Sequence, residues 1–193
     1  MKKLVTCKEM KDLDSTTIRE IGVPSEVLME RAALKVVEET EKYLQKDERI
    51  LVVCGSGNNG GDGIAVARLF HLKGIRVEFY MVGNKDKMTR ETALQYKIAS
   101  GYRVPEVNNP QWSEYTTIVD AVFGVGLTRP IEGHYADIIH EMNSARAKKI
   151  AVDIPSGVNG DTGLEMGIAF SADLTVTFAY RKRGLCFYPG RLY

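Results

Sequence analysis

Four stretches of this chain are apolar almost without interruption: ILVVC at 50–54, TTIVDAVFG at 116–124, KKIAVDI at 148–154 and LTVTFA at 174–179. A strand with one face in water alternates apolar and polar residues, whereas a strand that is covered on both faces does not. The runs therefore predict strands that are buried on both sides, as in a parallel sheet with helices packed against each face.

The segments between these runs supply the helices that such a sheet needs. We expect strands at 49–54, 75–82, 116–122, 148–153 and 173–179, and helices at about 62–73, 89–99 and 131–143. Near the start, Thr6-Cys7-Lys8-Glu9 fits a capping box, which predicts a helix that stops at about Gly22. Pro24-Ser25 begins a second helix. The alternation predicts one α/β domain over residues 1–193.

Composition and charge narrow the class of protein. A formal net charge of +1 argues against nucleic-acid binding, and we interpret the densest basic cluster, Arg181-Lys182-Arg183, as a solvated turn. No apolar run approaches the roughly 18 residues that span a bilayer, and the N-terminus lacks the apolar core of a signal peptide. Cys7, Cys54 and Cys186 are far apart, which predicts free thiols. We expect a cytoplasmic protein with no membrane partner.

Three polar, glycine-bearing segments follow expected strands. They are GSGNNGGDG at 55–63, FGVGLTRP at 123–130 and DIPSGVNGDTG at 153–163. Ligands of open α/β sheets bind in the crevice outside the carboxyl ends of the strands. If the strands are parallel, all three segments lie on that one rim, which predicts a ligand site there.

The first segment resembles a dinucleotide loop only in part. Gly55 to Gly60 satisfies G-x-G-x-x-G, but the next strand ends in Val82-Gly83-Asn84 without the acidic residue that binds the ribose of NAD. Asp62 would also repel a pyrophosphate at the helix start. The absence of a Gly-Lys-Ser/Thr sequence excludes a Walker loop. A tight turn with no ligand remains an alternative, but it leaves the asparagines and Asp62 unexplained.

Oxygen-bearing side chains come from three of the strand ends. Asn59, Asp120 and Ser156 offer amide, carboxylate and hydroxyl oxygens, which suit a simple cation. Capping of a helix or turn is the alternative role for Asp120 and Asp153. Both stand directly after buried apolar strands, however, where a carboxylate is costly unless it has partners.

The motifs GNNGGDG at 57–63, VDAVFGVGLTRP at 119–130 and VDIPSGVNGDTG at 152–163 resemble those of the NAD(P)H-hydrate epimerase family, the YjeF N-terminal domain. Gly22-Val23-Pro24, Leu28-Met29-Glu30 and TVTFAYRKRGL at 175–185 support the resemblance. It runs over nearly the whole chain. It implies a three-layer α/β/α Rossmann-like fold with a mostly parallel central sheet, and a homodimer.

The resemblance also implies a repair reaction. Hydration of the nicotinamide ring of NADH or NADPH gives R and S epimers, and the family interconverts them so that a partner dehydratase, separate or fused, can recover the whole pool. The implied potassium ligands are Asn59, Asp120 and Ser156. The residues implied to contact the hydrated dinucleotide are Asn58, Asn59, Gly60, Gly61, Asp62, Gly124, Val125, Gly126, Leu127, Thr128, Arg129, Pro130 and Asp153.

The chemistry needs a proton carrier. The lone pair of the ring nitrogen can expel the hydroxyl group from the neighbouring carbon if a proton carrier protonates that group. Water can then add to the other face of the ring. Asp153 is our first candidate for this catalytic role. Lys182 is the second, as a charge stabiliser or proton donor, with a solvated lysine as its alternative.

Two departures from the family pattern stand out. Where many members have Leu-Met-Glu-Asn-Ala-Gly, this chain has Leu28-Met29-Glu30-Arg31-Ala32-Ala33, and it stops at Tyr193 where members continue into a further strand. We expect either a domain that has been cut short at its C-terminus or a short form. Two other functions stay open: a non-catalytic ligand-binding or dimerisation module on the same fold, and an NAD-dependent dehydrogenase.

Overall fold

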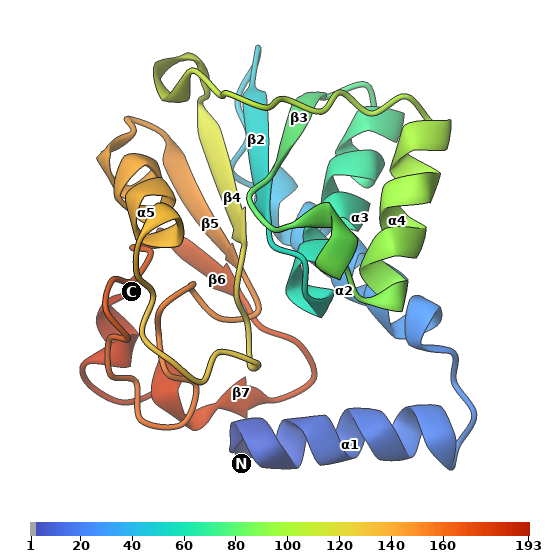
Figure 1. Ribbon diagram of the computed structural model, residues 1–193, viewed down its shortest axis with the longest axis vertical. Helices are drawn as coiled ribbons and strands as arrows, with labels where there is room; N and C mark the ends of the chain where they lie inside the picture. The colour runs from blue at the N-terminus through green and yellow to red at the C-terminus, as the bar shows by residue number, and fades with distance from the viewer. Residues whose placement is uncertain (1–2) are drawn as a thin grey trace.

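A computed structural model describes residues 3–193, and its centre is a parallel sheet of five strands. The strand order is β3-β2-β4-β5-β6, and every neighbouring pair is parallel (Figure 1). The strands are β2 (Arg49–Cys54), β3 (Arg76–Met81), β4 (Thr117–Ala121), β5 (Lys148–Val152) and β6 (Leu174–Val176). All five predicted strands are confirmed: β2 has the predicted bounds, and the ends of the others differ by at most three residues.

Helices cover both faces of this sheet, so the predicted three layers are confirmed. One face carries α2 (Ser25–Glu41), α3 (Asn58–Leu72) and α4 (Arg90–Gly101), and the other carries α5 (His134–Ser144) (Figure 1). Successive residues of β2 alternate between the two layers: Val52 packs in the core beneath α3, whereas Leu51 and Val53 pack in the core beneath α5. All three are fully buried. This is why the run ILVVC is apolar at every position.

Helix α3 begins four residues earlier than the sequence predicts. We expected it at about residue 62, but it starts at Asn58, with Gly57 in extended conformation as its N-cap. The prediction failed because Asn and Gly favour turns, whereas here tertiary packing decides. A side chain at Gly60 would lie 1.8 Å from the carbonyl oxygen of Gly55, and one at Gly63 would lie 2.4 Å from the Cβ of Ala121. The glycines let the helix pack directly against β2 and β4.

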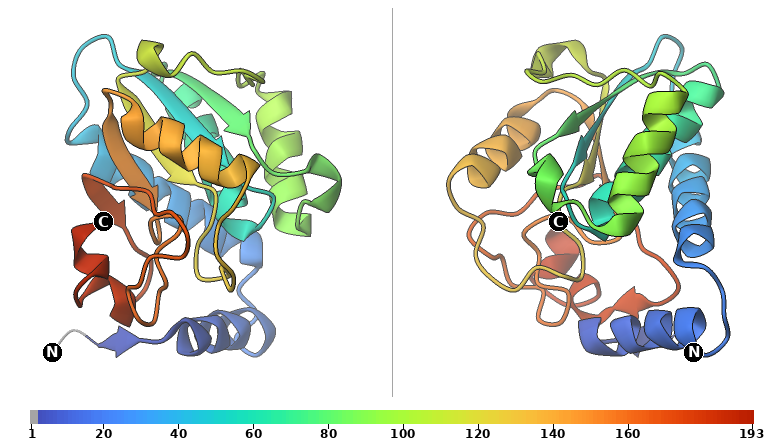
Figure 2. Two further views of the ribbon diagram at one scale, coloured as in Figure 1. Left: turned by 60° about the vertical axis from the view of Figure 1, so that its left-hand side comes forward. Right: turned by 45° about the vertical axis from the view of Figure 1, so that its right-hand side comes forward.

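A second, two-stranded sheet joins the two ends of the chain. Strand β1 (Leu4–Val5) pairs in parallel with β7 (Arg181–Lys182), and helix α1 (Cys7–Arg19) follows β1 with the predicted capping box of Thr6 and Glu9. No local pattern along the chain predicts this pairing. Figure 2 shows α1 crossing the end of the molecule toward which the loops after β4 and β5 extend. No helix within residues 3–193 has the length and apolar character to cross a membrane.

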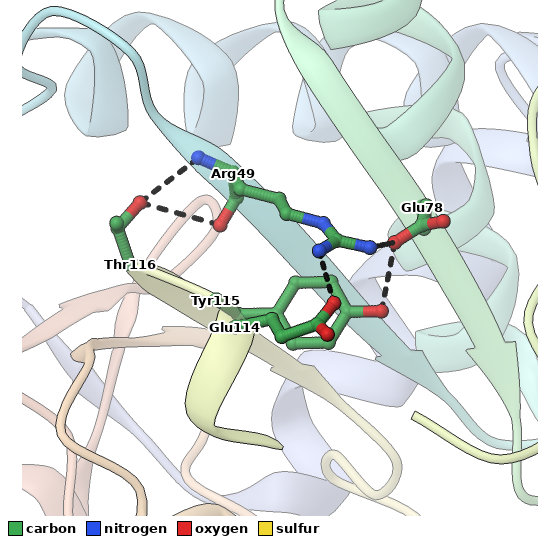
Figure 3. Close-up of polar contacts among 5 residues, drawn as sticks. All are labelled: Arg49, Glu78, Glu114, Tyr115 and Thr116. Atoms are coloured by element: carbon green, nitrogen blue, oxygen red, sulfur yellow. Dashed lines mark hydrogen bonds and ion pairs between the residues drawn. The ribbon is translucent and has the colours of Figure 1, made fainter. Parts of the chain in front are cut away.

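At the opposite end of the sheet, a polar network ties three strands together (Figure 3). The Arg49 guanidinium contacts Glu78 at 3.1 Å and also pairs with Glu114, and the Tyr115 hydroxyl donates to Glu78 at 2.7 Å. The Arg49 amide donates to the Thr116 hydroxyl at 2.9 Å. These groups lie where β2, β3 and β4 begin, so the network stabilises the amino-terminal edge of the sheet and leaves the other rim to the loops.

The packing of α3 predicts that Gly63→Ala is destabilising. The added methyl group would meet Ala121 and Cys54, and overpacking a tight core costs about 1–3 kcal/mol. Gly101→Ala is the matched control, because nothing lies within 4 Å of a side chain there and alanine favours a helix by about 0.5–1 kcal/mol. Urea unfolding of both variants checks this. Equal stabilities would contradict the close approach of α3 to the sheet.

Candidate functional site

The strand order itself marks where a ligand binds. The order β3-β2-β4-β5-β6 is that of flavodoxin-like sheets, whose topological switch point lies between the first and third strands of the unit, here β2 and β4. The segments after β2, β4 and β5 meet there, as predicted. The Gly55 amide donates to the Ala121 carbonyl at 3.0 Å, and the Phe123 amide donates to the Ser156 hydroxyl at 2.8 Å.

The turn into α3 is held from the side by the start of α4. The Thr92 hydroxyl donates to the Gly57 carbonyl at 2.9 Å, and the Thr89 amide donates to the Ser56 carbonyl at 3.0 Å. Gly60 and Gly61 are buried within the first turn, whereas Asn58 is exposed at its tip. The amide groups of a first helical turn have no partner within the helix, so they form a fixed set of donors suited to an anion.

A cavity of about 270 Å³ opens beside the loop after β4. Its walls are Cys7, Lys11, Gly124, Val125, Leu127, Thr128, Val158, Asn159, Gly160 and Asp161. Four of the seven loop residues predicted to bind substrate therefore line it, whereas Gly126, Arg129 and Pro130 do not. The exposed Arg129 and Pro130 lie at the far end of the loop.

One wall of this cavity comes from α1, which sequence reasoning missed. The Cys7 amide donates to Asp161 Oδ1 at 2.6 Å, a contact between residues 154 positions apart. No local pattern signals such a contact. Burial and the neighbouring Asp161 raise the pKa of the Cys7 thiol to about 11, so this cysteine is not a nucleophile at neutral pH.

Asp120 is fully buried at the end of β4 and has no cationic side chain beside it within the described residues. Its carboxylate accepts hydrogen bonds from the Ser156 amide at 2.7 Å, the Ser156 hydroxyl at 2.6 Å and the Val122 amide at 3.1 Å. Burial raises its pKa to about 6, although these hydrogen bonds oppose the shift. A buried carboxylate of this kind gains from a bound cation.

Asn59 lies beside the loop that follows β4. A side chain added at Gly124 would lie 3.2 Å from the Asn59 amide oxygen, and Ser156 bonds the preceding residue, Phe123. The Asn59 amide nitrogen is buried without a hydrogen-bond partner in the described part of the chain. Asn59, Asp120 and Ser156 thus gather around residues 120–124. One carboxylate with neutral oxygens suits a singly charged cation, and residues 3–193 contain no cluster of three or more His, Cys, Asp or Glu side chains that could hold a metal.

Lys182 and Asp153 form a buried ion pair. Lys182 is 1% exposed, and its Nζ lies 2.5 Å from Asp153 Oδ1, with the Thr177 hydroxyl and the Phe178 carbonyl each at 3.1 Å. The interpretation of Arg181-Lys182-Arg183 as a solvated turn is therefore wrong for its central residue. The pairing of β7 with β1 turns Lys182 inward and leaves its two neighbours exposed.

The backbone at Asp153 is also unusual. Its φ of 69° lies in the left-handed region, where residues other than glycine are uncommon and often mark functional sites. The carboxylate accepts two further hydrogen bonds, from the Thr177 hydroxyl and the Phe178 amide, each at 3.2 Å. Strand β6 ends at Val176, three residues before the predicted end, and beyond it the Phe178 amide binds this side chain.

Sequence comparisons place the chain among known proteins. The sequence model of a family described as "YjeF-related protein N-terminus" matches residues 25–184. An NAD(P)H-hydrate epimerase of Limosilactobacillus fermentum is 45% identical over 190 residues, which cover 98% of this chain and 91% of that protein. An NAD(P)H-hydrate epimerase of Oenococcus oeni is 48% identical over 191 residues, covering 97% and 90%.

A structural comparison agrees on the fold. The crystal structure of yeast ynu0 matches with a TM-score of 0.85 and 22% sequence identity, and it covers 98% of this chain and 86% of the yeast chain. At this level of identity, the likeness supports the three-layer fold alone.

The buried pair predicts that Lys182→Met is strongly destabilising. The substitution keeps an unbranched apolar stem but leaves Asp153 without its counter-charge, and breaking one side of a buried ion pair costs about 3–5 kcal/mol. Arg181→Met, at the exposed neighbouring position, should change stability by less than about 0.5 kcal/mol. Adding Asp153→Asn to Lys182→Met should recover part of the loss. Urea unfolding measures all four proteins, and equal losses for Lys182→Met and Arg181→Met would contradict the pairing.

Proposed function

This chain belongs to the family of YjeF-related protein N-termini, and on that basis we propose that it is an NAD(P)H-hydrate epimerase. The observation that carries the proposal is its identity of 45% to such an epimerase over 98% of this chain and 91% of the relative. The protein is thus an isomerase that interconverts the R and S epimers of hydrated NADH and NADPH, and residues 1–193 act as one epimerase domain.

The dinucleotide lies in the crevice between β2 and β4. The amide groups at the start of α3, with Asn58 and Asn59, face its phosphates, because a helix N-terminus favours an anion. The loop of residues 124–130 covers it from the side of the cavity that Cys7 and Lys11 also line. Asp153 lies beside the reacting ring, at the end of β5.

The reaction requires no redox step. The lone pair of the ring nitrogen expels the hydroxyl from the neighbouring carbon as water once a proton is supplied, and a planar cation remains. Water adds to the other face and loses a proton, which inverts the centre. Asp153 exchanges this proton. Lys182 holds the Asp153 carboxylate in place through the contact of 2.5 Å between Nζ and Oδ1.

A potassium ion between Asn59, Asp120 and Ser156 completes the site in this proposal. Burial of Asp120 without a cationic side chain and the unpartnered amide of Asn59 support it. When bound, the ion supplies a positive charge that neutralises Asp120 and attracts the phosphates. Asp120 and Ser156 themselves fix the loops after β4 and β5 relative to each other, through the hydrogen bonds that join them.

The wider setting follows from the same assignment. The epimerase supplies one epimer to an NAD(P)H-hydrate dehydratase, separate or fused. The dehydratase consumes that epimer. We propose a homodimer, for which the exposed apolar side chains of Leu13, Ile21 and Val27 offer a surface. Three free thiols fit a reducing, cytoplasmic setting.

The proposed function predicts that purified protein accelerates the approach of R and S hydrated NADH to equilibrium. Chromatography that separates the two epimers, starting from either one, measures the rate. A folded sample that binds the hydrated cofactor but leaves the rate unchanged would instead identify a non-catalytic binding module. Hydride transfer to a carbonyl substrate would identify a dehydrogenase.

The cation site predicts a potassium-dependent stability. Potassium chloride should raise the Tm relative to tetramethylammonium chloride of equal ionic strength, because a ligand at 100 times its Kd adds about 2.7 kcal/mol, or roughly 2–4 °C for each kcal/mol. Asp120→Ala should abolish this difference, because it removes the only formal charge among the ligands. Asp137→Ala, at an exposed position on α5, is the control and should keep it. A difference that survives Asp120→Ala would refute the assignment.

A further inference from the structure

The cavity of about 270 Å³ beside the loop after β4 carries two opposite charges that do not pair with each other. Lys11 of α1 and Asp161 of the loop after β5 both line it. Within residues 3–193, the Lys11 ammonium group forms no ion pair or hydrogen bond, and the Asp161 carboxylate uses only Oδ1, which accepts from the Cys7 amide at 2.6 Å. The ammonium group and the second carboxylate oxygen can therefore both bind one ligand in the cavity.

Local structure fixes these two charges one helical turn apart. Cys7 and Lys11 are four residues apart on α1, so their side chains lie on one face of the helix, about 6 Å apart along its axis. Both line the cavity, so this face is turned toward it. The bond from the Cys7 amide holds Asp161 at the first turn, and the Asn159 side chain accepts from the Asp161 amide at 3.0 Å. Asp161 and Lys11 thus line one cavity from successive turns of α1.

The cavity adjoins the buried pair of Lys182 and Asp153. Gly160 lines it, and a side chain at Gly160 would lie 2.8 Å from Ile154 Cδ1 and 4.0 Å from Lys182 Cβ. The Gly184 amide, close behind Lys182 in the chain, donates to the Gly160 carbonyl at 2.8 Å. Asp153 itself does not line the cavity. The cavity is therefore a separate compartment that lies next to the proposed proton carrier.

The two charges restrict the chemical group that fits between them. A phosphate would be attracted by Lys11 but repelled by Asp161, and a cation would meet the reverse. An ammonium group only donates hydrogen bonds and a carboxylate only accepts them. A neutral group with one acceptor and one donor satisfies both. A primary carboxamide is such a group, because its carbonyl oxygen accepts from Lys11 while its NH₂ group donates to Asp161.

We propose that Lys11 and Asp161 bind the carboxamide of the hydrated nicotinamide ring and thereby position the ring against Asp153. This inference rests on the proposed function. The carbon that bears the carboxamide lies across the ring from the carbon that bears the hydroxyl. When the hydroxyl faces Asp153, the carboxamide therefore points away from it, toward a neighbouring compartment. Lys11 and Asp161 are positioning residues that set specificity for the ring, and neither exchanges the proton.

Adenine is the other part of the dinucleotide that combines a donor with an acceptor. It lies at the opposite end of the molecule from the reacting ring, whereas this cavity lies beside Lys182 and close to Asp153. The position of the cavity thus favours the carboxamide. Substrate analogues that change only one end of the dinucleotide distinguish the two groups.

Binding of such analogues is the first test. Epimerisation consumes nothing, so titration calorimetry with the equilibrated epimers measures Kd whether or not the protein is active. The hydrated 3-acetylpyridine analogue of NADH has a methyl group in place of the NH₂ group, and the parent should bind it about 10-fold or more weakly than hydrated NADH. The hydrated hypoxanthine analogue keeps the carboxamide and should bind within a few-fold. Equal binding of all three compounds, or the reverse order, would overturn the proposal.

Two variants then separate the two contacts. Asp161→Asn keeps an oxygen for the Cys7 amide but replaces the second oxygen by an NH₂ group. Its Kd for hydrated NADH should rise about 10- to 100-fold, whereas its Kd for the 3-acetylpyridine analogue should stay within a few-fold. Lys11→Met removes the donor to the carbonyl, which both compounds have, so both Kd values should rise about 10-fold. An equal loss for both compounds in Asp161→Asn would indicate a structural role only and would overturn the proposal.

Lys8→Met is the matched control for Lys11→Met. Lys8 lies on the same helix with its side chain 85% exposed, and it does not line the cavity. All three Kd values should stay at those of the parent, and urea unfolding checks that each variant is folded. The proposed function is tested separately: a parent that shows this binding pattern but does not interconvert the epimers would overturn the epimerase assignment alone. A parent that interconverts them but binds all three compounds alike would overturn the carboxamide site alone.

Discussion

The close packing of α3 on the sheet is the constraint on which the site depends. Gly60 approaches the Gly55 backbone and Gly63 approaches Ala121 at distances that exclude any side chain. The approach brings the first turn of the helix to the switch point between β2 and β4. Asn59 and Asp62 project from that turn, so the position of both relative to Asp120 and Asp153 follows from where the helix packs. A helix held a few ångströms away would separate these groups.

Burial of charge is the second constraint, and the rim compensates its charges in different ways. Asp153 has a lysine and two further donors, whereas Asp120 has three hydrogen bonds but no cationic side chain. Since an uncompensated charge is costly away from water, Asp153 is stabilised by its lysine and its other donors, whereas Asp120 favours a bound cation. Such differences between neighbouring carboxyl groups are common at catalytic sites.

Helix α1 links these features to the ends of the chain. It is anchored by the pairing of β1 with β7 and by the bond of Cys7 to Asp161, and it contributes Cys7 and Lys11 to the cavity wall. The same pairing of strands turns Lys182 inward. Two residues of β7 thus connect the anchoring of α1 with the ion pair beside the proposed reacting ring, which explains why a basic segment at the surface contains one fully buried lysine.

The sequence by itself determined the fold class and the rim. Apolar runs and the spacing of helices are local patterns, so the five strands, the two-sided sheet and the convergence of three loops could be predicted from them. The ligand set of Asn59, Asp120 and Ser156 could also be proposed, because each lies near the carboxyl end of a predicted strand. The family motifs extend over the same loops, which is why the functional assignment was within reach of the sequence.

Only the tertiary structure decided which groups meet. Lys182 and Asp153 are 29 residues apart, Cys7 and Asp161 are 154 apart, and no periodicity connects either pair. The start of α3 at Asn58 was likewise decided by packing against Gly55 and Ala121, which overrides the turn preference of asparagine and glycine. The reason is physical: patterns along the chain record whether a position is buried, whereas the partner of a buried charge depends on how distant segments pack around it.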